Sequence, residues 1–249
     1  MNLPSEKIIN SLKALGINAF VFEEVSTTFD KAKELIKTYA DGVVIAEQQT
    51  GGRGKGDRKF VSPSGGLYFT VFRKDVKIKP SDALKTVINA GFGVYSQLKQ
   101  LGFNAKLKWP NDVLIDGKKV CGILTETFTK DDCCDLLCGV GVNVNTKDFG
   151  EFNNIATSLC LSGGKEYDIA DVAVKIIAGV EERLFDGSEP NDEFLSASGM
   201  QGKTVKVTNG AEEYFCKVKG LSPDGFLIGD RDGKEIKIIC GDVKEVENG

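Results

Sequence analysis

The residues with the clearest capacity for chemistry lie in one loop, at positions 49–60. Residues 51–56 contain four glycines, whose backbone N–H groups can approach a bound anion closely. The loop also carries four cations against the single acid Asp57, a local charge of +3 in a chain of net charge −4; the cations are Arg53, Lys55, Arg58 and Lys59. A small polyanion would be drawn to this charge. The same composition also fits a solvated hairpin turn, because glycine-rich polar loops are common connectors.

A second group of polar side chains surrounds a predicted hairpin at residues 106–126. The Asp116-Gly117 pair lies between two apolar runs, which is typical of a β-hairpin turn, and it places Lys119 just inside the second strand. Pro110 cannot donate to a strand ladder, so its neighbours are expected in irregular backbone, where ligands are often bound. Those neighbours are Trp109, Asn111 and Asp112.

The composition restricts the chemistry and the location. The chain has no histidine, which excludes Ser-His and Cys-His catalysis and leaves Lys, Arg, Asp, Glu and bound ligands to act. Seven cysteines without an export signal favour reduced thiols and a cytoplasmic location. Cys133, Cys134 and Cys138 lack the paired spacing of a zinc site. The net charge of −4 disfavours a general nucleic-acid binder, and no apolar run is long enough to span a membrane.

The elements that must position these residues follow from the hydrophobic pattern and the length. A chain of 249 residues favours one large and one small domain, placed here at residues 1–199 and 200–249. Helical spacing predicts helices at residues 4–16, 27–39, 80–101 and 169–185, with a shorter one after Pro190. Apolar runs predict strands at 19–23, 42–46, 67–72, 113–115, 120–124 and 136–145. Four short alternating runs beyond residue 200 predict a small β-barrel, at 204–207, 214–218, 226–228 and 235–239.

Four motifs together resemble biotin–protein ligase, also called biotin–[acetyl-CoA-carboxylase] ligase, in their order and spacing. They are Gln49 with Gly52-Arg53-Gly54-Lys55; Lys108-Trp109-Pro110-Asn111-Asp112; Lys119 with Gly122-Ile123-Leu124; and Gly139-Val140-Gly141-Val142-Asn143. The resemblance implies an α+β fold in which helices flank a mixed β-sheet, like the catalytic core of class II aminoacyl-tRNA synthetases, followed by a small C-terminal SH3-like β-barrel. Some family members carry an N-terminal DNA-binding domain. Only about 20 residues precede the first predicted ligase strand here, so we expect the form without that domain and no DNA binding.

The resemblance also implies a two-step reaction. The carboxylate of biotin attacks the α-phosphate of ATP to give biotinyl-5′-AMP and pyrophosphate, and a lysine of a biotin carboxyl carrier protein then attacks the mixed anhydride. Because the first step brings two anions together, fixed cations at the reacting centre would lower its barrier. Biotin and ATP are then the substrates, Mg²⁺ accompanies the phosphates, and a carrier domain of a biotin-dependent carboxylase is the partner. Family members are often dimers, so a homodimer is one expected assembly.

By the same resemblance, particular residues are assigned roles. Arg53 and Lys119 would contact the biotin carboxylate and the phosphate, and Asp112 would place the magnesium-bound phosphates or serve the incoming amine. The biotin site would comprise Ser26, Thr27, Gln49, Gly52, Arg53, Lys119 and Gly122. The ATP or adenylate site would comprise Arg53, Lys55, Phe60, Trp109, Asn111, Asp112 and Asn143.

Three positions depart from the family's usual pattern or vary it. Lys55 stands where arginine is usual, so a point charge replaces a bidentate fork, and we expect the adenylate to be retained less tightly. Asp57 follows Gly56 where a glycine is often found, which leaves the path of the loop open. Phe60 takes the place of an aromatic residue that can cover the adenine, so stacking is retained.

Two other functions compete with this interpretation. A lipoate or octanoate ligase or transferase has a similar fold, but it would ordinarily show a Gly-Gly-Gly-x-Val-x-His run, and the chain has no histidine. A non-catalytic ligand- or RNA-binding module could be built on the C-terminal barrel. Residues 200–249 hold eight Lys and Arg against nine Asp and Glu, however, and this near-neutral balance disfavours RNA binding.

Overall fold

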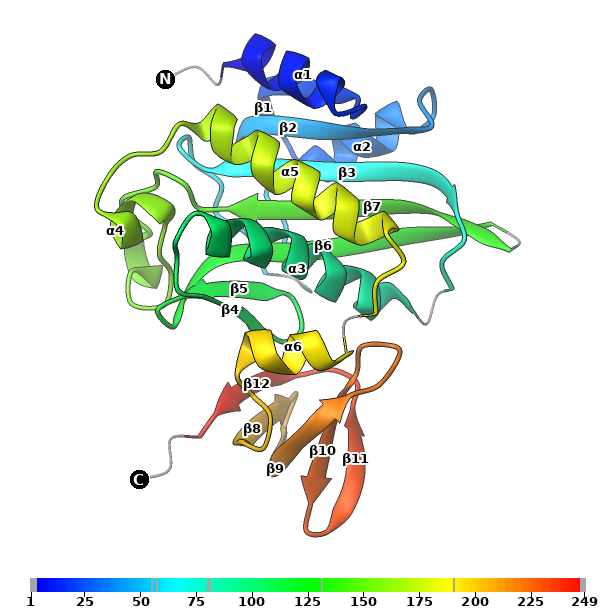
Figure 1. The fold of residues 1–249 in the computed structure, drawn as a ribbon, viewed down its shortest axis with the longest axis vertical. Coiled ribbons are helices and arrows are strands. Elements are labelled where there is room, and N and C mark those ends of the chain that lie inside the picture. The colour runs from blue at the N-terminus through cyan, green and yellow to red at the C-terminus, as the bar shows by residue number, and fades with distance from the viewer. Residues whose placement is uncertain are drawn as a thin grey trace.

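A mixed β-sheet of seven strands lies at the centre of the larger part of the protein (Figure 1). The computed structural model describes residues 4–54, 56, 58–79, 82–130, 132–189 and 191–246. The strands are β1 (Ala19–Val25), β2 (Asp41–Gln49), β3 (Leu67–Val76), β4 (Ala105–Lys108), β5 (Asp112–Ile115), β6 (Lys118–Lys130) and β7 (Cys133–Val142). Their order is β1-β2-β3-β7-β6-β5-β4, with β1 and β2 parallel and the other neighbours antiparallel.

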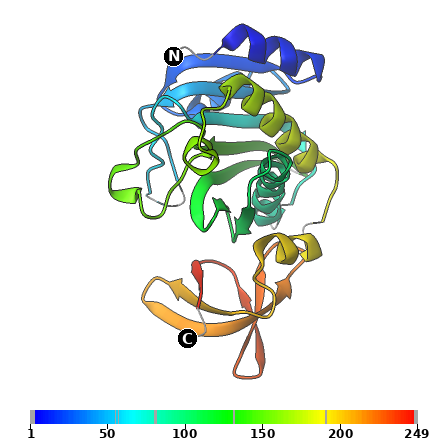
Figure 2. The same ribbon diagram turned by 60° about the vertical axis from the view of Figure 1, so that its left-hand side comes forward.

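Helices cover the two faces of this sheet unequally. One face packs against α1 (Ser5–Ala14), α3 (Ala83–Gln100) and α5 (Ile169–Phe185), and the opposite face carries only the eight-residue α2 (Thr28–Leu35) (Figures 1 and 2). Strand alternation explains the division, since Val43 belongs to the core of the first face while Val44 packs with Phe29 of α2. No described helix is long and apolar enough to cross a membrane. The predicted α+β fold with a mixed sheet flanked by helices is confirmed.

Most predicted elements are found, and the differences have local causes. The helix predicted at 169–185 is α5, whose N-cap Asp168 accepts hydrogen bonds from two backbone N–H groups of its first turn. The helix predicted at 27–39 ends earlier, at Leu35, so Tyr39 lies outside it. The four-residue β4 is not among the predicted strands; its alternation of two apolar residues with two lysines is regular but short. Strand β7 ends at Val142, so Asn143 and Asn145 follow it rather than lie on it. Beyond β7 come the short helices η2 (Gly150–Phe152) and α4 (Leu159–Gly163).

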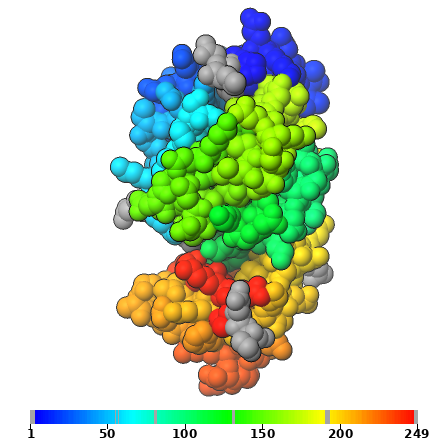
Figure 3. All heavy atoms as spheres, turned by 90° about the vertical axis from the view of Figure 1, so that its left-hand side faces the viewer, coloured from blue at the N-terminus to red at the C-terminus, as the bar shows by residue number. Residues whose placement is uncertain are grey.

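The C-terminal part contains a second, five-stranded antiparallel sheet that follows helix α6 (Asn191–Ser198) (Figure 2). Its strands are β8 (Thr204–Asn209), β9 (Glu212–Leu221), β10 (Leu227–Arg231), β11 (Lys234–Ile238) and β12 (Asp242–Glu245), in the order β11-β10-β9-β8-β12. Four of the five were predicted, and β12 was not. This sheet packs against the end of the larger part (Figure 3), where the indole N–H of Trp109 donates to the Gly225 carbonyl at 3.0 Å.

Gly225 makes the contact between the two parts sensitive to one added methyl group. It adopts a φ of +84°, and a Cβ there would lie 3.0 Å from Cδ1 of Ile88 and 3.1 Å from the backbone nitrogen of Lys85. We expect Gly225→Ala to lower the free energy of unfolding by about 2–4 kcal/mol, because left-handed strain and overpacking add. Urea unfolding measures this. Gly210→Ala is the matched control, since Gly210 has a φ of +61° with no described atom within 4 Å of a built Cβ. It should cost only the strain, about 1–2 kcal/mol; equal losses would contradict the packing argument.

Candidate active site

Many of the predicted site residues line a single cavity on the α2 side of the large sheet. Its open space, including the mouth, is about 730 Å³. It lies between the loop that joins β2 to β3, the start of α2, and strands β5, β6 and β7. Seven predicted residues line it: Gln49, Arg53, Phe60, Asn111, Asp112, Lys119 and Gly122. The two cations expected to act together are therefore in one cavity.

The glycine-rich loop is a hairpin and a cavity wall at once. Arg53 and Lys59 form an antiparallel bridge, Gly54 N–H donates to the Arg58 carbonyl at 2.7 Å, and Phe60 N–H donates to the Gly52 carbonyl at 3.0 Å. The expected hairpin is therefore present, and Arg53, Arg58 and Lys59 line the cavity. Anion binding by this loop stays a prediction. Lys55 and Asp57, on which two predictions rest, lie outside the described residues.

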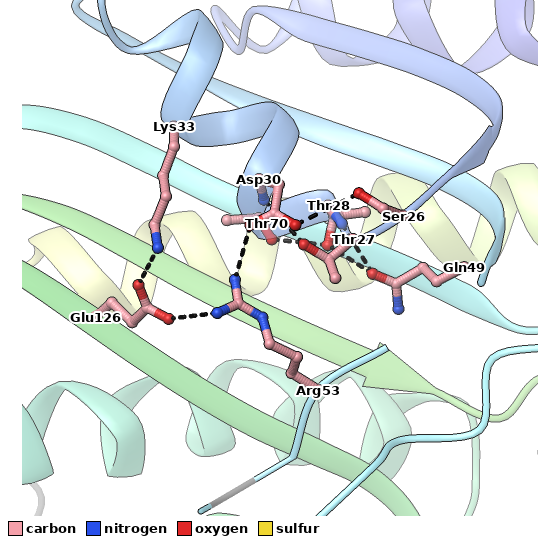
Figure 4. Close-up of polar contacts among 9 residues, drawn as sticks. All are labelled: Ser26, Thr27, Thr28, Asp30, Lys33, Gln49, Arg53, Thr70 and Glu126. Atoms are coloured by element: carbon pink, nitrogen blue, oxygen red, sulfur yellow. Dashed lines mark hydrogen bonds and ion pairs between the residues drawn. The ribbon is translucent and has the colours of Figure 1, made fainter. Parts of the chain in front are cut away.

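Thr28 and the half-buried Gln49 form the polar end of the cavity, and they belong to a chain of hydrogen bonds that continues behind it (Figure 4). Oε1 of Gln49 accepts from the Thr28 N–H at 2.9 Å and from Thr28 Oγ1 at 3.2 Å, and Thr70 Oγ1 donates to Thr28 Oγ1 at 2.8 Å. Nε2 of Gln49 donates to Ser62 Oγ at 2.9 Å. Thr28, Thr70 and Ser62 were not among the predicted site residues. Thr70 carried one weak signal, because it is the single aliphatic hydroxyl in the apolar run 67–72.

The predicted hydroxyls at the start of α2 have different surroundings. Thr27 is the N-cap of the helix and its Oγ1 accepts from the Asp30 N–H at 2.9 Å. Ser26 is exposed and its Oγ donates to the Asp30 carboxylate at 3.4 Å. Neither residue lines the cavity in its described extent. Their contact with biotin stays a prediction.

Arg53 is held between two carboxylates that come from two other elements (Figure 4). Its Nη1 lies 3.2 Å from Glu126 of β6, and its Nη2 lies 3.2 Å from Asp30 of α2. Lys33 binds the second oxygen of Glu126 at 2.7 Å, and the guanidinium lies over the Phe29 ring at 5.1 Å. The sequence analysis did not predict these partners, which are far from Arg53 along the chain.

Lys119 forms an ion pair with Asp112 across the β5–β6 hairpin. The distance is 2.6 Å, and both side chains are at least partly shielded from solvent. The Lys119 backbone pairs with the segment after η2, because its N–H donates to the Ile155 carbonyl at 2.8 Å and its carbonyl accepts from the Thr157 N–H at 2.8 Å. These contacts fix the strand on both sides, so the amine points into the cavity from a rigid base.

Glycines on the sheet provide room for two aromatic rings. A Cβ at Gly141 would lie 2.5 Å from the Phe60 ring, and one at Gly122 would lie 3.0 Å from it. A Cβ at Gly139 would lie 2.2 Å from the Phe29 ring. The space beside Gly139 and Gly141 is therefore occupied by side chains of the protein itself. The close neighbour of Gly52 is likewise internal, since a Cβ there would lie 2.3 Å from the Phe60 carbonyl oxygen.

Three predicted adenylate residues make hydrogen bonds within the protein. The Asn111 side-chain amide donates to the Ile123 carbonyl at 3.1 Å beside the cavity. The Asn143 amide is buried and donates to the Thr157 carbonyl at 2.9 Å, and Trp109 is buried against the small sheet. Asn143 and Trp109 are not among the described lining residues. Their adenylate contacts stay predictions.

The thiols are not arranged for catalysis. All seven cysteines are thiols rather than disulfides, and burial raises the pKa of the Cys121 and Cys138 thiols well above its usual value, which suppresses the nucleophilic thiolate. Among the described residues, no group of three or more Cys, Asp or Glu side chains is placed to hold a metal ion. The ionisable groups among the described lining residues are Arg53, Arg58, Lys59, Lys119 and Asp112.

Comparison with known proteins agrees with this arrangement. Residues 21–143 match the biotin/lipoate A/B protein ligase family. The bifunctional ligase/repressor BirA of Bacillus subtilis is 30% identical over 250 aligned positions, covering 93% of this chain and 75% of that protein. The biotin–[acetyl-CoA-carboxylase] ligase of Paracoccus denitrificans is 37% identical over 199 positions, covering 74% of this chain and 82% of that protein.

A solved structure gives the same result in three dimensions. The biotin protein ligase of Aquifex aeolicus in complex with biotin and ATP superposes with a TM-score of 0.77 at 29% identity, covering 93% of this chain and 99% of that one. The match includes both sheets, because so little of either chain is left uncovered. The chain belongs to the biotin/lipoate A/B protein ligase family, and within it to the biotin protein ligases.

Proposed function

We propose that this protein activates biotin with ATP to biotinyl-5′-AMP and transfers the biotin to a lysine of a biotin carboxyl carrier protein. The observation that supports this most directly is the convergence of Arg53 and Lys119 on one cavity, next to a buried polar chain. An anion and a polar ring could be bound side by side there. The membership in the biotin protein ligases supplies the reaction.

For biotin, we assign the polar end of the cavity to the ureido ring. Gln49 is oriented by Thr28 and Ser62, so its amide is fixed before a ligand binds. Thr28 and Thr70 join the predicted set of Ser26, Thr27, Gln49, Gly52 and Gly122 as candidates. The biotin carboxylate would then lie towards Arg53 and Lys119.

For the adenylation step, the cations counter the charge that builds up when a carboxylate attacks a phosphate. Arg53 and Lys119 would contact the reacting carboxylate and the α-phosphate, and preorganised charge of this kind costs no reorganisation during the reaction. The adenylate would be covered by Phe60, with Lys55, Trp109, Asn111 and Asn143 as the further candidates. Pyrophosphate is the leaving group, and the carrier lysine later displaces AMP.

We assign Mg²⁺ to the side of the cavity that holds Asp112. Mg²⁺ in ATP sites usually takes one or two carboxylates plus phosphate oxygens, and Asp112 is the single carboxylate among the described lining residues. The donor set therefore fits an ion held mainly by the phosphates, whose charge it would neutralise. Asp112 otherwise holds the Lys119 amine at 2.6 Å, so it also orients that cation.

We also propose that the chain forms two domains with different roles. Residues 1–199 would form the catalytic domain and residues 200–249 an SH3-like barrel domain. The partner would be the carrier domain of a biotin-dependent carboxylase, and the reaction would take place in the cytoplasm. The protein would not bind DNA, and a homodimer is one possible assembly. The name of the Paracoccus relative supports the carboxylase partner, and the free thiols support a reducing compartment.

The proposal is tested by biotin-dependent exchange of labelled pyrophosphate into ATP, run beside lipoate. We expect exchange with biotin and none with lipoate, because exchange reports the reversible formation of the adenylate alone. Exchange with lipoate alone would replace biotin by lipoate as the substrate. No exchange with either compound would favour a non-catalytic binding module.

A further inference from the structure

The surroundings of Arg53 go beyond what anion binding by a lone cation requires. The residue projects from the β2–β3 loop, yet its guanidinium contacts Glu126 on β6 and Asp30 on α2, at 3.2 Å each. The two ion pairs use different nitrogens, Nη1 and Nη2, and the plane lies against the Phe29 ring at 5.1 Å. Two ion pairs and one ring contact therefore restrict the orientation of the guanidinium.

The charges around Arg53 are balanced. Lys33 lies 2.7 Å from Oε2 of Glu126, while Arg53 takes Oε1, so one carboxylate serves two cations. Arg53 and Lys33 together match the charge of Asp30 and Glu126. This arrangement lowers the positive potential that Arg53 offers to an anionic substrate. Electrostatic attraction alone would therefore be stronger without the two acids.

We propose that Glu126 and Asp30 are positioning residues, which hold the Arg53 guanidinium in the orientation that the adenylation step uses. Arginine has many rotamers, and fixing them before the substrate arrives avoids an entropic cost in the transition state. Two ion pairs engage two of the five N–H donors of a guanidinium, so donors remain for an anion. Lys33 pairs with the other oxygen of Glu126 at 2.7 Å and so holds this carboxylate in place. This inference rests on the proposed function and adds residues to it.

Stability is not the main effect of these contacts. The Arg53 side chain is 37% exposed, Asp30 is 51% exposed and Glu126 is 28% exposed. Ion pairs with this exposure contribute little to folding. Their removal should consequently leave the unfolding transition almost unchanged while it alters the reaction.

The sign of the effect of Glu126→Gln separates positioning from charge. If Glu126 merely opposed the anionic substrates, its neutralisation would raise kcat/KM for pyrophosphate exchange. If it positions Arg53, we expect kcat/KM to fall about tenfold, with a shift of the melting temperature below about 2 °C. Asp30→Asn should change the rate in the same direction. Glu34→Gln is the matched control, because Glu34 is an exposed glutamate of α2 that pairs with Lys31 at 2.6 Å, and its rate should equal that of the wild-type protein.

A double-mutant cycle shows whether Glu126 acts through Arg53. Lysine at position 53 lacks the planar fork of nitrogens with which arginine binds two carboxylates. In the Arg53→Lys background, Glu126→Gln should therefore lower kcat/KM for pyrophosphate exchange less than about twofold. An unchanged or higher rate in Glu126→Gln, or an equal loss in both backgrounds, would overturn the inference while wild-type exchange still supports the proposed function. Absence of biotin-dependent exchange in the wild-type protein would overturn both.

Discussion

Replacing Arg53 or Lys119 by alanine is expected to lower biotin-dependent pyrophosphate exchange at least about 100-fold, which is the usual loss when one preorganised donor to a developing anion is removed. Both side chains line the cavity, and each enters from a separate element, the β2–β3 loop and strand β6. Neither can therefore substitute for the other. Initial exchange rates at saturating biotin and ATP measure the effect on kcat.

Two controls make this result specific. Lys31→Ala and Lys147→Ala each remove a lysine that pairs with a glutamate and does not line the cavity, at 2.6 and 2.7 Å, and they should retain the wild-type rate. Circular dichroism and thermal unfolding should show that the Arg53 and Lys119 variants remain folded, since both side chains are about a third exposed. Full exchange activity in both variants would refute the assignment of the catalytic cations.

The elements of the fold could be predicted where one residue pattern dominated. Helix α5 was found at both ends because its amphipathic pattern continues without a break from residue 169 to residue 185. The strand order could not be predicted, since β3 pairs with β7 across a long sequence separation and nothing local specifies that partner. The turn at Asp116-Gly117 was found because both residues adopt positive φ, which favours this dipeptide.

In the site, too, residues marked by a local motif could be predicted, whereas residues brought together only by the fold could not. Gln49, Arg53 and Lys119 were found because a motif marks each of them, and they do line one cavity. Glu126 and Thr70 could not be assigned, because their importance comes from the pairing of β3, β7 and β6, which brings them next to the loop and to α2. Trp109 belongs to a strong motif, yet its indole contacts the small sheet, which its own sequence context does not reveal.

Breaking the ion pair between Arg73 and Glu181 should make the free energy of unfolding depend more strongly on pH. Oε2 of Glu181 lies 2.9 Å from Nη2 of Arg73, the carboxylate is only 10% exposed, and the guanidinium covers the Phe185 ring at 3.5 Å. Burial raises the pKa of Glu181 above its ordinary value, while the charge of Arg73 opposes that rise. Removing Arg73 therefore leaves a buried carboxylate without its counter-charge.

We expect Arg73→Met to lower the free energy of unfolding by about 2–4 kcal/mol at pH 8, because a buried charge loses its partner. A carboxyl group whose pKa is raised in the folded state favours folding fully below its unfolded-state pKa, and this contribution is lost as the pH rises through the folded-state pKa. Without Arg73 the folded-state pKa rises further, so the loss of stability should be smaller at pH 5, where Glu181 can take up a proton. Urea unfolding at the two pH values measures the difference.

The double variant Arg73→Met with Glu181→Gln isolates the cause, because a neutral amide has no charge to leave unpaired. Its stability should exceed that of Arg73→Met at pH 8, and the extra pH dependence should disappear. Since the pair joins β3 to α5 on the face opposite the cavity, exchange activity at 25 °C should survive in both variants wherever they are folded. An equal loss of stability at pH 5 and pH 8 in Arg73→Met would show that lost packing on Phe185, rather than the charge of Glu181, dominates this contact.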